Sequence, residues 1–242
     1  MRLKLIDSPN FTKKNRSKKN IKFLIIHYTG MQSESESIKR LTDIRSKVSS
    51  HYLINRKGNI IQMVSEKHVA WHAGKSQWKN YINLNNSSIG IELVNRGHEF
   101  GYQSFSFKQI KSLKLLLVKL AKKYKIKKNC ILGHSDIAPL RKIDPGEKFP
   151  WSKIININFD KLNFKSNKLM AKNFSKKQIT KLFIKNLYKI GYRYFNKNSS
   201  SINPLLIKAF QRRFRQSKVN GLIDKETFLL SNYIVNKLKK LT

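Results

Sequence analysis

The chain has 242 residues, of which 40% are hydrophobic, enough for one large domain or for a medium domain with a smaller one. It has 51 Lys and Arg residues but only 13 Asp and Glu residues. The resulting formal net charge of +38 predicts attraction to polyanions. A single cysteine, Cys130, excludes an internal disulfide. No run of 18 apolar residues occurs, so we expect no membrane span.

The excess of positive charge has two interpretations. An anionic partner, such as nucleic acid, a membrane surface or an acidic cell-wall polymer, would explain it. A genome that over-uses lysine would also explain it, because the lysines are spread along the chain and form no dense tail. The sequence shows no recognised nucleic-acid motif and no basic stripe with stacking aromatics, so we expect no specific nucleic-acid binding.

Residues 1–20 are expected to form an N-terminal extension. They carry basic residues but no continuous apolar segment and no small-residue cleavage site, so no signal peptide is predicted. This favours a cytoplasmic location. Export to the periplasm or cell wall by an unrecognised route is the alternative.

Alternating strands and helices are predicted over residues 21–154. Short β-branched apolar runs indicate buried strands, and Lys57-Gly58-Asn59 indicates the turn of a hairpin. Because several strands lack hairpin connections, we expect an α/β (α+β mixed) fold with a central mixed β-sheet flanked by helices. The expected strands are 21–29, 86–95 and 129–134 with a hairpin over 51–66, and the expected helices are 33–46 and 105–126.

The character of the chain changes after residue 154. Residues 155–173 are rich in Asn and Lys with weak periodicity, which is typical of a linker. Residues 174–242 return to helical periodicity, and Pro204 stands where the first turn of a helix tolerates it. We expect a small three-helix domain there, with helices over 175–192, 203–217 and 224–241.

Two histidines are placed where α/β sheets bind ligands. His27 and His134 each end a predicted buried strand, and Asp144 follows His134 by ten residues in the loop GHSDIAPLRKIDPG. A lone histidine in an apolar strand is more often a core residue. Two imidazoles and one carboxylate, however, leave an open position in a tetrahedral zinc site, as catalysis requires.

Metal-assisted hydrolysis also needs a base and a cation. Glu92 lies among apolar neighbours in the strand IGIELVN, where an acid is rarely buried without a role, and it would take the proton of the attacking water. Lys142, two residues before Asp144, would stabilise the oxyanion formed from the attacked carbonyl. The alternatives are a Glu92 carboxylate paired with a lysine and a Lys142 that is an ordinary surface residue.

Over about residues 21–154 the chain resembles the zinc-dependent N-acetylmuramoyl-L-alanine amidases of the amidase type 2 group. The resemblance rests on five ordered motifs: IIHYTG, SSHYLINRKGNIIQMV, AWHAG, SIGIELVN and GHSDIAPLRKIDPGEKFPW. It implies one Zn²⁺ per chain held by His27, His134 and Asp144, with Glu92 as general base and Lys142 at the oxyanion. It further implies hydrolysis of the amide between N-acetylmuramic acid, or its 1,6-anhydro form, and L-Ala of the peptidoglycan stem peptide, in cell-wall turnover or recycling.

Four further residues are candidates for binding the muropeptide substrate. Trp71 and His72 of AWHAG would line the groove, or simply pack in a loop. Arg141 would bind a stem-peptide carboxylate, since Arg suits planar bidentate recognition, or be solvated. His51 begins a strand beside the site and would support it. Asp136 is expected to be a turn or cap residue rather than a metal ligand.

The C-terminal domain resembles the small peptidoglycan-binding domain often attached to such enzymes, through AFQRRF and NGLIDKET. Asn220 stands where that pattern has Asp, and Asp224 stands where it has a second Gly, so a helical extension that packs on the catalytic domain is the alternative. Two other functions compete with catalysis. One is a non-catalytic peptidoglycan-recognition protein, which typically lacks a zinc ligand, and the other is a basic nucleic-acid-binding protein.

Overall fold

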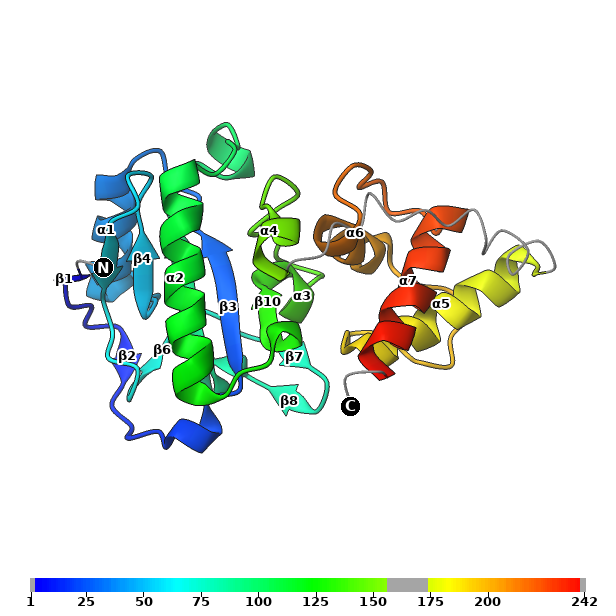
Figure 1. The fold of residues 1–242 in the computed structure, drawn as a ribbon, viewed down its shortest axis with the longest axis horizontal. Coiled ribbons are helices and arrows are strands. Elements are labelled where there is room, and N and C mark those ends of the chain that lie inside the picture. Colours follow the sequence, from blue (N-terminus) through cyan, green and yellow to red (C-terminus); the bar gives the residue numbers. More distant parts are fainter. Residues whose placement is uncertain (1–2, 156–173, 240–242) are drawn as a thin grey trace.

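The computed structural model describes residues 3–155 and 174–239, and its centre is a six-stranded mixed sheet with the strand order β1-β5-β4-β9-β3-β10 (Figure 1). Strands β4, β9, β3 and β10 run parallel to one another, whereas β4 and β5 form the predicted antiparallel hairpin. The predicted mixed sheet flanked by helices is confirmed. The strands are β1 (Leu3–Leu5), β3 (Phe23–Tyr28), β4 (Tyr52–Ile54), β5 (Ile60–Gln62), β9 (Ser88–Leu93) and β10 (Ile131–Gly133).

Serine residues cap the N-termini of three helices. Ser33, Ser106 and Ser175 each accept a hydrogen bond from a backbone N–H in the first turn, which satisfies a donor that the helix leaves free. The predicted helix over 33–46 ends earlier, at Thr42, because the Asp43 carboxylate accepts from the Arg45 N–H and starts a separate 3₁₀ turn. The α-helices are α1 (Glu34–Thr42), α2 (Phe107–Tyr124), α3 (His134–Ile137), α4 (Trp151–Ile155), α5 (Lys176–Ile190), α6 (Pro204–Phe214) and α7 (Lys225–Lys239).

Shorter elements complete the described chain. Two small antiparallel ladders pair β2 (Phe11–Thr12) with β6 (Val69–Ala70) and β7 (Gln77–Trp78) with β8 (Tyr81–Ile82). Five 3₁₀ turns lie at Lys18–Asn20, Ile44–Ser46, Leu84–Ser87, His98–Phe100 and Lys128–Cys130.

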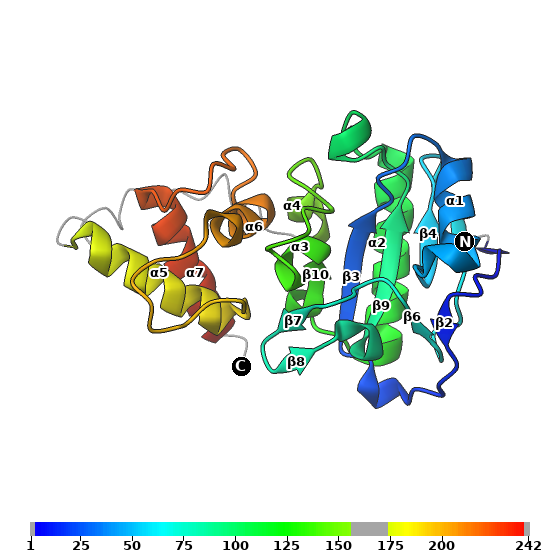
Figure 2. The ribbon, with the colours of Figure 1, turned by 180° about the vertical axis from the view of Figure 1, so that it is seen from behind.

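The residues of β3 alternate between two cores. Leu24 and Ile26 pack beneath α2, the long amphipathic helix that covers one face of the sheet, whereas Phe23 and Ile25 pack on the opposite face (Figures 1 and 2). His27 is next in the second set. The parallel register places it beside Glu92 of β9, so both polar side chains lie on the face away from α2, at the carboxyl ends of their strands.

The N-terminal segment belongs to this part of the molecule rather than forming an extension. β1 adds an edge strand to the sheet by pairing with β5, and β2 pairs with β6. The Arg16 guanidinium is buried and donates to the backbone carbonyls of Asn85, Ser88 and Glu66. Segments of two or three residues carry too little apolar periodicity to be predicted as strands. We call residues 3–155 the sheet domain.

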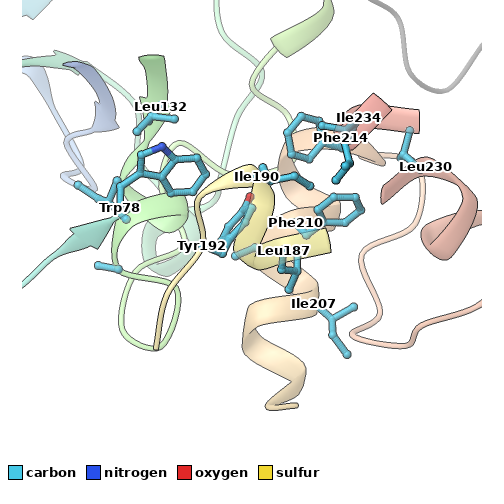
Figure 3. Close-up of a cluster of buried hydrophobic side chains, with 14 of the residues drawn as sticks. Trp78, Leu132, Leu187, Ile190, Tyr192, Ile207, Phe210, Phe214, Leu230 and Ile234 are labelled. Carbon is cyan, nitrogen blue, oxygen red and sulfur yellow. The ribbon is translucent and has the colours of Figure 1, made fainter. Parts of the chain in front are cut away.

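Residues 174–239, the helical domain, form the three predicted helices and pack against the edge of the sheet domain beside β10 and α3 (Figures 1 and 2). Their contact is one continuous apolar core: Trp78 and Leu132 of the sheet domain meet Tyr192, Ile190 and other helical-domain side chains (Figure 3). The Trp78 and Tyr192 rings meet edge to face with centroids 4.9 Å apart. The predicted linker, 155–173, lies outside the described residues except for Ile155, which ends α4.

Candidate metal centre

Three predicted ligands converge at the carboxyl end of β3. His27 Nδ1 lies 3.0 Å from His134 Nδ1, and Asp144 Oδ2 lies 3.1 Å from each of these nitrogens. All three side chains are buried. His27 comes from β3, His134 begins α3 directly after β10, and Asp144 follows on the same segment. The backbone N–H of Ser135 donates to the carbonyl of Asp144 at 2.9 Å, which ties the two ends of that segment together.

The surrounding hydrogen bonds indicate which ring nitrogens carry protons. His134 Nε2 lies 3.1 Å from the Ala73 carbonyl oxygen, an acceptor, so Nε2 carries the proton and Nδ1 is bare. The Ser88 hydroxyl donates to the Leu84 carbonyl and therefore accepts from His72 Nε2 at 3.1 Å. His72 Nδ1 is then an acceptor for His27 Nε2, 3.0 Å away, and His27 Nδ1 is bare as well.

His27 Nδ1, His134 Nδ1 and Asp144 Oδ2 therefore face one another with no proton between them. Burial lowers the pKa of His27 to about 4, helped by the neighbouring His134 and Lys142, so its imidazole is neutral near pH 7. Two neutral imidazoles and a carboxylate repel one another unless a cation lies among them.

The donor set and its spacing fit a metal ion. Ligand atoms about 2.0–2.2 Å from a common tetrahedral ion lie roughly 3.3 Å apart, close to the separations here. In the described part of the chain, these three residues form the cluster of His, Cys and acidic side chains able to hold an ion. Each histidine also donates its second ring N–H to a neighbour, the arrangement that usually orients metal-binding imidazoles.

Glu92 stands beside this cluster with one oxygen unpaired. Its Oε2 is buried without a hydrogen-bond partner among the described residues. Burial raises the pKa of Glu92 to about 8, the nearby Asp144 charge adds to the rise, and Lys142 opposes it. A carboxyl group with a pKa close to neutrality and a free oxygen can both take up and release a proton.

A cavity of about 450 Å³ opens over these residues. Lys142 and Arg141 line it beside Asp144. Arg141 also binds the protein itself: its guanidinium donates to the carbonyls of Ala73 and Lys75 and so holds the loop that orients His134. The cavity volume of about 450 Å³ is within the range of small-ligand sites.

The remaining predicted residues are placed differently from one another. Trp71 lines the cavity and donates through Nε1 to the Thr12 hydroxyl at 3.0 Å. His72 lines the cavity too, but both its nitrogens bond to His27 and Ser88. His51 is fully buried behind His72 and is not among the cavity residues; its Nδ1 accepts from the Gly90 N–H at 3.0 Å.

The cavity residues that the sequence analysis did not single out include Tyr28, Arg40, His98 and Glu99. Tyr28 directly follows His27, which is a signal that was available. Its hydroxyl bonds to His98 Nδ1 at 2.9 Å, and His98 Nε2 lies 3.2 Å from the Glu147 carboxylate. Arg40 is one basic residue among 51, and only the packing of α1 beside the sheet brings it to the cavity.

Known proteins resemble this chain over much of its length. A family model described as N-acetylmuramoyl-L-alanine amidase matches residues 17–147, more than half of the chain. The amidase AmiD of Escherichia coli strain K12 is 35% identical over 90% of this chain and 83% of that protein. The chain belongs to the N-acetylmuramoyl-L-alanine amidase family. The 1,6-anhydro-N-acetylmuramyl-L-alanine amidase AmpD of Haemophilus influenzae is 35% identical over 62% of this chain and 89% of its own length.

Solved structures of the family extend the likeness to the helical domain. Escherichia coli AmiD, in complex with the substrate anhydro-N-acetylmuramic acid-L-Ala-D-γ-Glu-L-Lys, has a TM-score of 0.75 at 32% identity and covers 94% of this chain and 98% of its own. AmpDh3 from Pseudomonas aeruginosa, in complex with anhydromuramic pentapeptide, has a TM-score of 0.77 at 28% identity, over 97% of this chain and 98% of its own. The expected amidase fold and enzyme class are confirmed.

Among the described helices of this amidase, none has the length and apolar character needed to cross a bilayer.

Proposed function

We propose that this amidase uses one Zn²⁺ per chain to hydrolyse the amide bond between N-acetylmuramic acid, including its 1,6-anhydro form, and L-Ala of peptidoglycan stem peptides. The observation that carries the proposal is the convergence of three bare acceptor atoms, from His27, His134 and Asp144. Beside them lies a carboxyl oxygen of Glu92 that has no hydrogen-bond partner within residues 3–155 and 174–239. The anhydro-muropeptides bound to AmiD and AmpDh3 support the substrate class.

The zinc ion would act as a Lewis acid for the substrate carbonyl and would lower the pKa of an attacking water. Glu92 would accept the proton of that water, and the same carboxyl group would then deliver it to the leaving amine of L-Ala. The pKa of Glu92, raised to about 8 chiefly by burial, keeps this group close to the protonation boundary at neutral pH. Lys142, on the cavity wall beside Asp144, would stabilise negative charge on the attacked oxygen.

We also propose how the cavity holds the stem peptide. The basic side chains of Arg40 and Lys142 give the wall positive charge that suits the free carboxylates of stem peptides. Trp71 offers an aromatic surface at the same wall. Arg141 and His72 already bond to protein groups, so their contribution is to orient His134 and His27. His51 supports His72 from behind.

The test is a digestion of purified muropeptides read by mass spectrometry. Muropeptides ending in N-acetylmuramic acid and in its 1,6-anhydro form are incubated with the full chain, with and without a chelator. We expect release of a free peptide that begins with L-Ala, lost on chelation and restored by Zn²⁺. Glu92→Gln should abolish release, whereas Glu36→Gln, which changes an exposed carboxylate on α1, should not.

A folded, zinc-loaded chain that cuts neither substrate would overturn the proposal and favour the non-catalytic peptidoglycan-recognition function. Pull-down on insoluble peptidoglycan would then be the next measurement. If cleavage survives chelation and metal-free dialysis, the amidase activity stands but its dependence on Zn²⁺ does not.

A further inference from the structure

The helical domain reaches the metal-binding segment through a buried cluster of polar side chains. Asp136 of α3 lies two residues after His134. Its Oδ2 accepts from the Gly133 N–H and from Arg213 Nη1, both at 2.7 Å, and its Oδ1 accepts from the Tyr192 hydroxyl at 2.7 Å. Asp136, Tyr192 and Arg213 are each at most 5% exposed. The cap predicted for Asp136 is present, as the bond to Gly133, but two of its three donors come from the helical domain.

The Arg213 guanidinium joins several elements of the sheet domain. Besides Asp136 of α3, its Nη2 donates to the carbonyl of Ile131 in β10 at 2.8 Å. The guanidinium carbon lies 4.3 Å from the ring centre of Trp151 in α4, within the range of a cation–π contact. One side chain of α6 therefore contacts β10, α3 and α4. These three elements lie at the edge of the sheet domain that faces α6 (Figure 2).

A second contact holds the far side of the same segment. The Gln216 amide donates through Nε2 to the carbonyls of Glu147 and Phe149, both at 2.5 Å. These residues follow Asp144 closely, just as Asp136 follows His134. The helical domain thus contacts the segment 133–149 after each of its two metal ligands. Between His134 and Asp144 this segment contains only the remaining three residues of α3 and a series of turns.

We propose that Arg213 and Tyr192 are positioning residues for the metal site, so that the helical domain contributes to metal affinity. The inference rests on the proposed zinc site. A short helix and turns have little rigidity of their own, and each ligand that must be ordered on binding costs conformational entropy. By anchoring Asp136, the helical domain holds His134 in place before the metal arrives. Partners of this kind behind metal ligands commonly change affinity without touching the ion.

The experiment measures zinc affinity of the full chain by competition with a chelator, together with the visible absorption of the Co²⁺-loaded protein, which reports ligand geometry. The variants are Tyr192→Phe, which removes one hydroxyl, and Arg213→Lys, which keeps the charge but not the fork that reaches Asp136 and Ile131 together. The matched control is Ser231→Ala. It removes one buried hydroxyl that contacts Asn186 inside the helical domain. Far-UV circular dichroism checks that each variant is folded.

We expect the zinc dissociation constant to rise several-fold in Tyr192→Phe and by about tenfold or more in Arg213→Lys, with an altered Co²⁺ spectrum. Ser231→Ala should bind zinc as the unmodified chain does. Should Arg213→Lys fail to fold, Tyr192→Phe decides alone.

Unchanged zinc affinity and Co²⁺ spectrum in the folded variants would overturn the inference. An equal loss of zinc affinity in Ser231→Ala and Tyr192→Phe would also overturn it, because the effect would then come from general stability. An unmodified chain that binds no zinc overturns the proposed metal site and this inference with it. An unmodified chain that binds zinc, with variants that bind it equally well, overturns the inference alone.

Discussion

Asp136 and Asp144 lie eight residues apart on one segment, and both are buried, but their surroundings differ. The Asp136 carboxylate receives a backbone N–H, a tyrosine hydroxyl and a guanidinium. Asp144 Oδ2 faces two imidazole nitrogens that carry no proton. The first carboxylate is fully satisfied by the protein and the second is not.

This difference separates a structural charge from a functional one. A buried ion is tolerated when donors and an opposite charge compensate for the water it has lost. Where the protein supplies acceptors instead, the compensation must come from a ligand, and here the acceptors have the spacing of a metal site. Burial and charge alone would not have distinguished the two aspartates; the direction of each hydrogen bond does.

The largest effect is expected from Asp144→Asn, which tests whether Asp144 is a metal ligand rather than a structural carboxylate. We expect zinc binding to be lost and amidase activity to fall by more than about a thousandfold, because the Lewis acid is missing. Zinc at about a thousand times its dissociation constant should stabilise the unmodified chain by about 4 kcal/mol and the variant not at all. In metal-free protein the variant should be at least as stable as the unmodified chain, since an amide N–H can donate to a bare imidazole nitrogen.

The same change at the other aspartate should have the opposite signature. Asp136→Asn leaves the Arg213 guanidinium buried without its carboxylate, and removing one partner of a buried ion pair costs about 3–5 kcal/mol. Urea unfolding of metal-free protein measures this, with Asp7→Asn, an exposed carboxylate, as control. If metal-free Asp136→Asn and Asp144→Asn were equally destabilised, the distinction between the two sites would be wrong.

A smaller effect is expected one step behind the metal site. Ser88→Ala removes the acceptor that holds the His72 Nε2 proton and, through His72, the tautomer of His27. We expect zinc affinity to fall by about tenfold. Ser76→Ala, which removes another buried serine hydroxyl from the same region, is the matched control and should leave zinc affinity unchanged. Equal losses in the two variants would argue for a packing effect.

The smallest effect expected is the contribution of Asp224, a partly exposed carboxylate, to the stability of the helical domain. Burial alone would raise the pKa of Asp224, but hydrogen bonds from Arg215 and Thr227 outweigh it and lower that pKa to about 2. Because the folded-state pKa lies below the unfolded value of about 3.9, Asp224 stabilises the chain above pH 4 and loses this contribution as the pH falls toward 2. With 31% of the side chain exposed, we expect no more than about 1 kcal/mol.

Thermal unfolding between pH 2 and pH 5 would measure that contribution. Asp224→Asn should lower the melting temperature at pH 5 by a few degrees and leave it nearly unchanged at pH 2. A difference that grows as the pH falls would contradict the assignment.

Much of the fold could be predicted because its signals are local. The 3.6-residue periodicity of α2 and the apolar runs of β3 and β9 depend on a few neighbouring residues, and the structure confirms them. The strand β1 and the separate turn after Thr42 were not predicted, since the first is three residues long and the second depends on one side-chain bond from Asp43.

The candidate site was predictable in part for a different reason. His27 and His134 end predicted strands, which suggested that they meet, and Glu92 was singled out as an acid among apolar neighbours within another strand. The role of Arg213 could not be predicted, because the sequence shows it as one of 51 basic residues. Likewise, the apolar faces of α5 and α6 fit a self-contained bundle equally well, and only the packing shows that they complete a core shared with Trp78.

The pairing of His27 with Glu92 across β3 and β9 has a consequence for how such a chain can change over time. Deleting one residue within either strand would turn the side chains beyond that point to the opposite face, beneath α2. Length variation is therefore tolerable in the loops that follow these strands but not inside them. The length of each strand is therefore constrained by the other, because only one register places His27 beside Glu92.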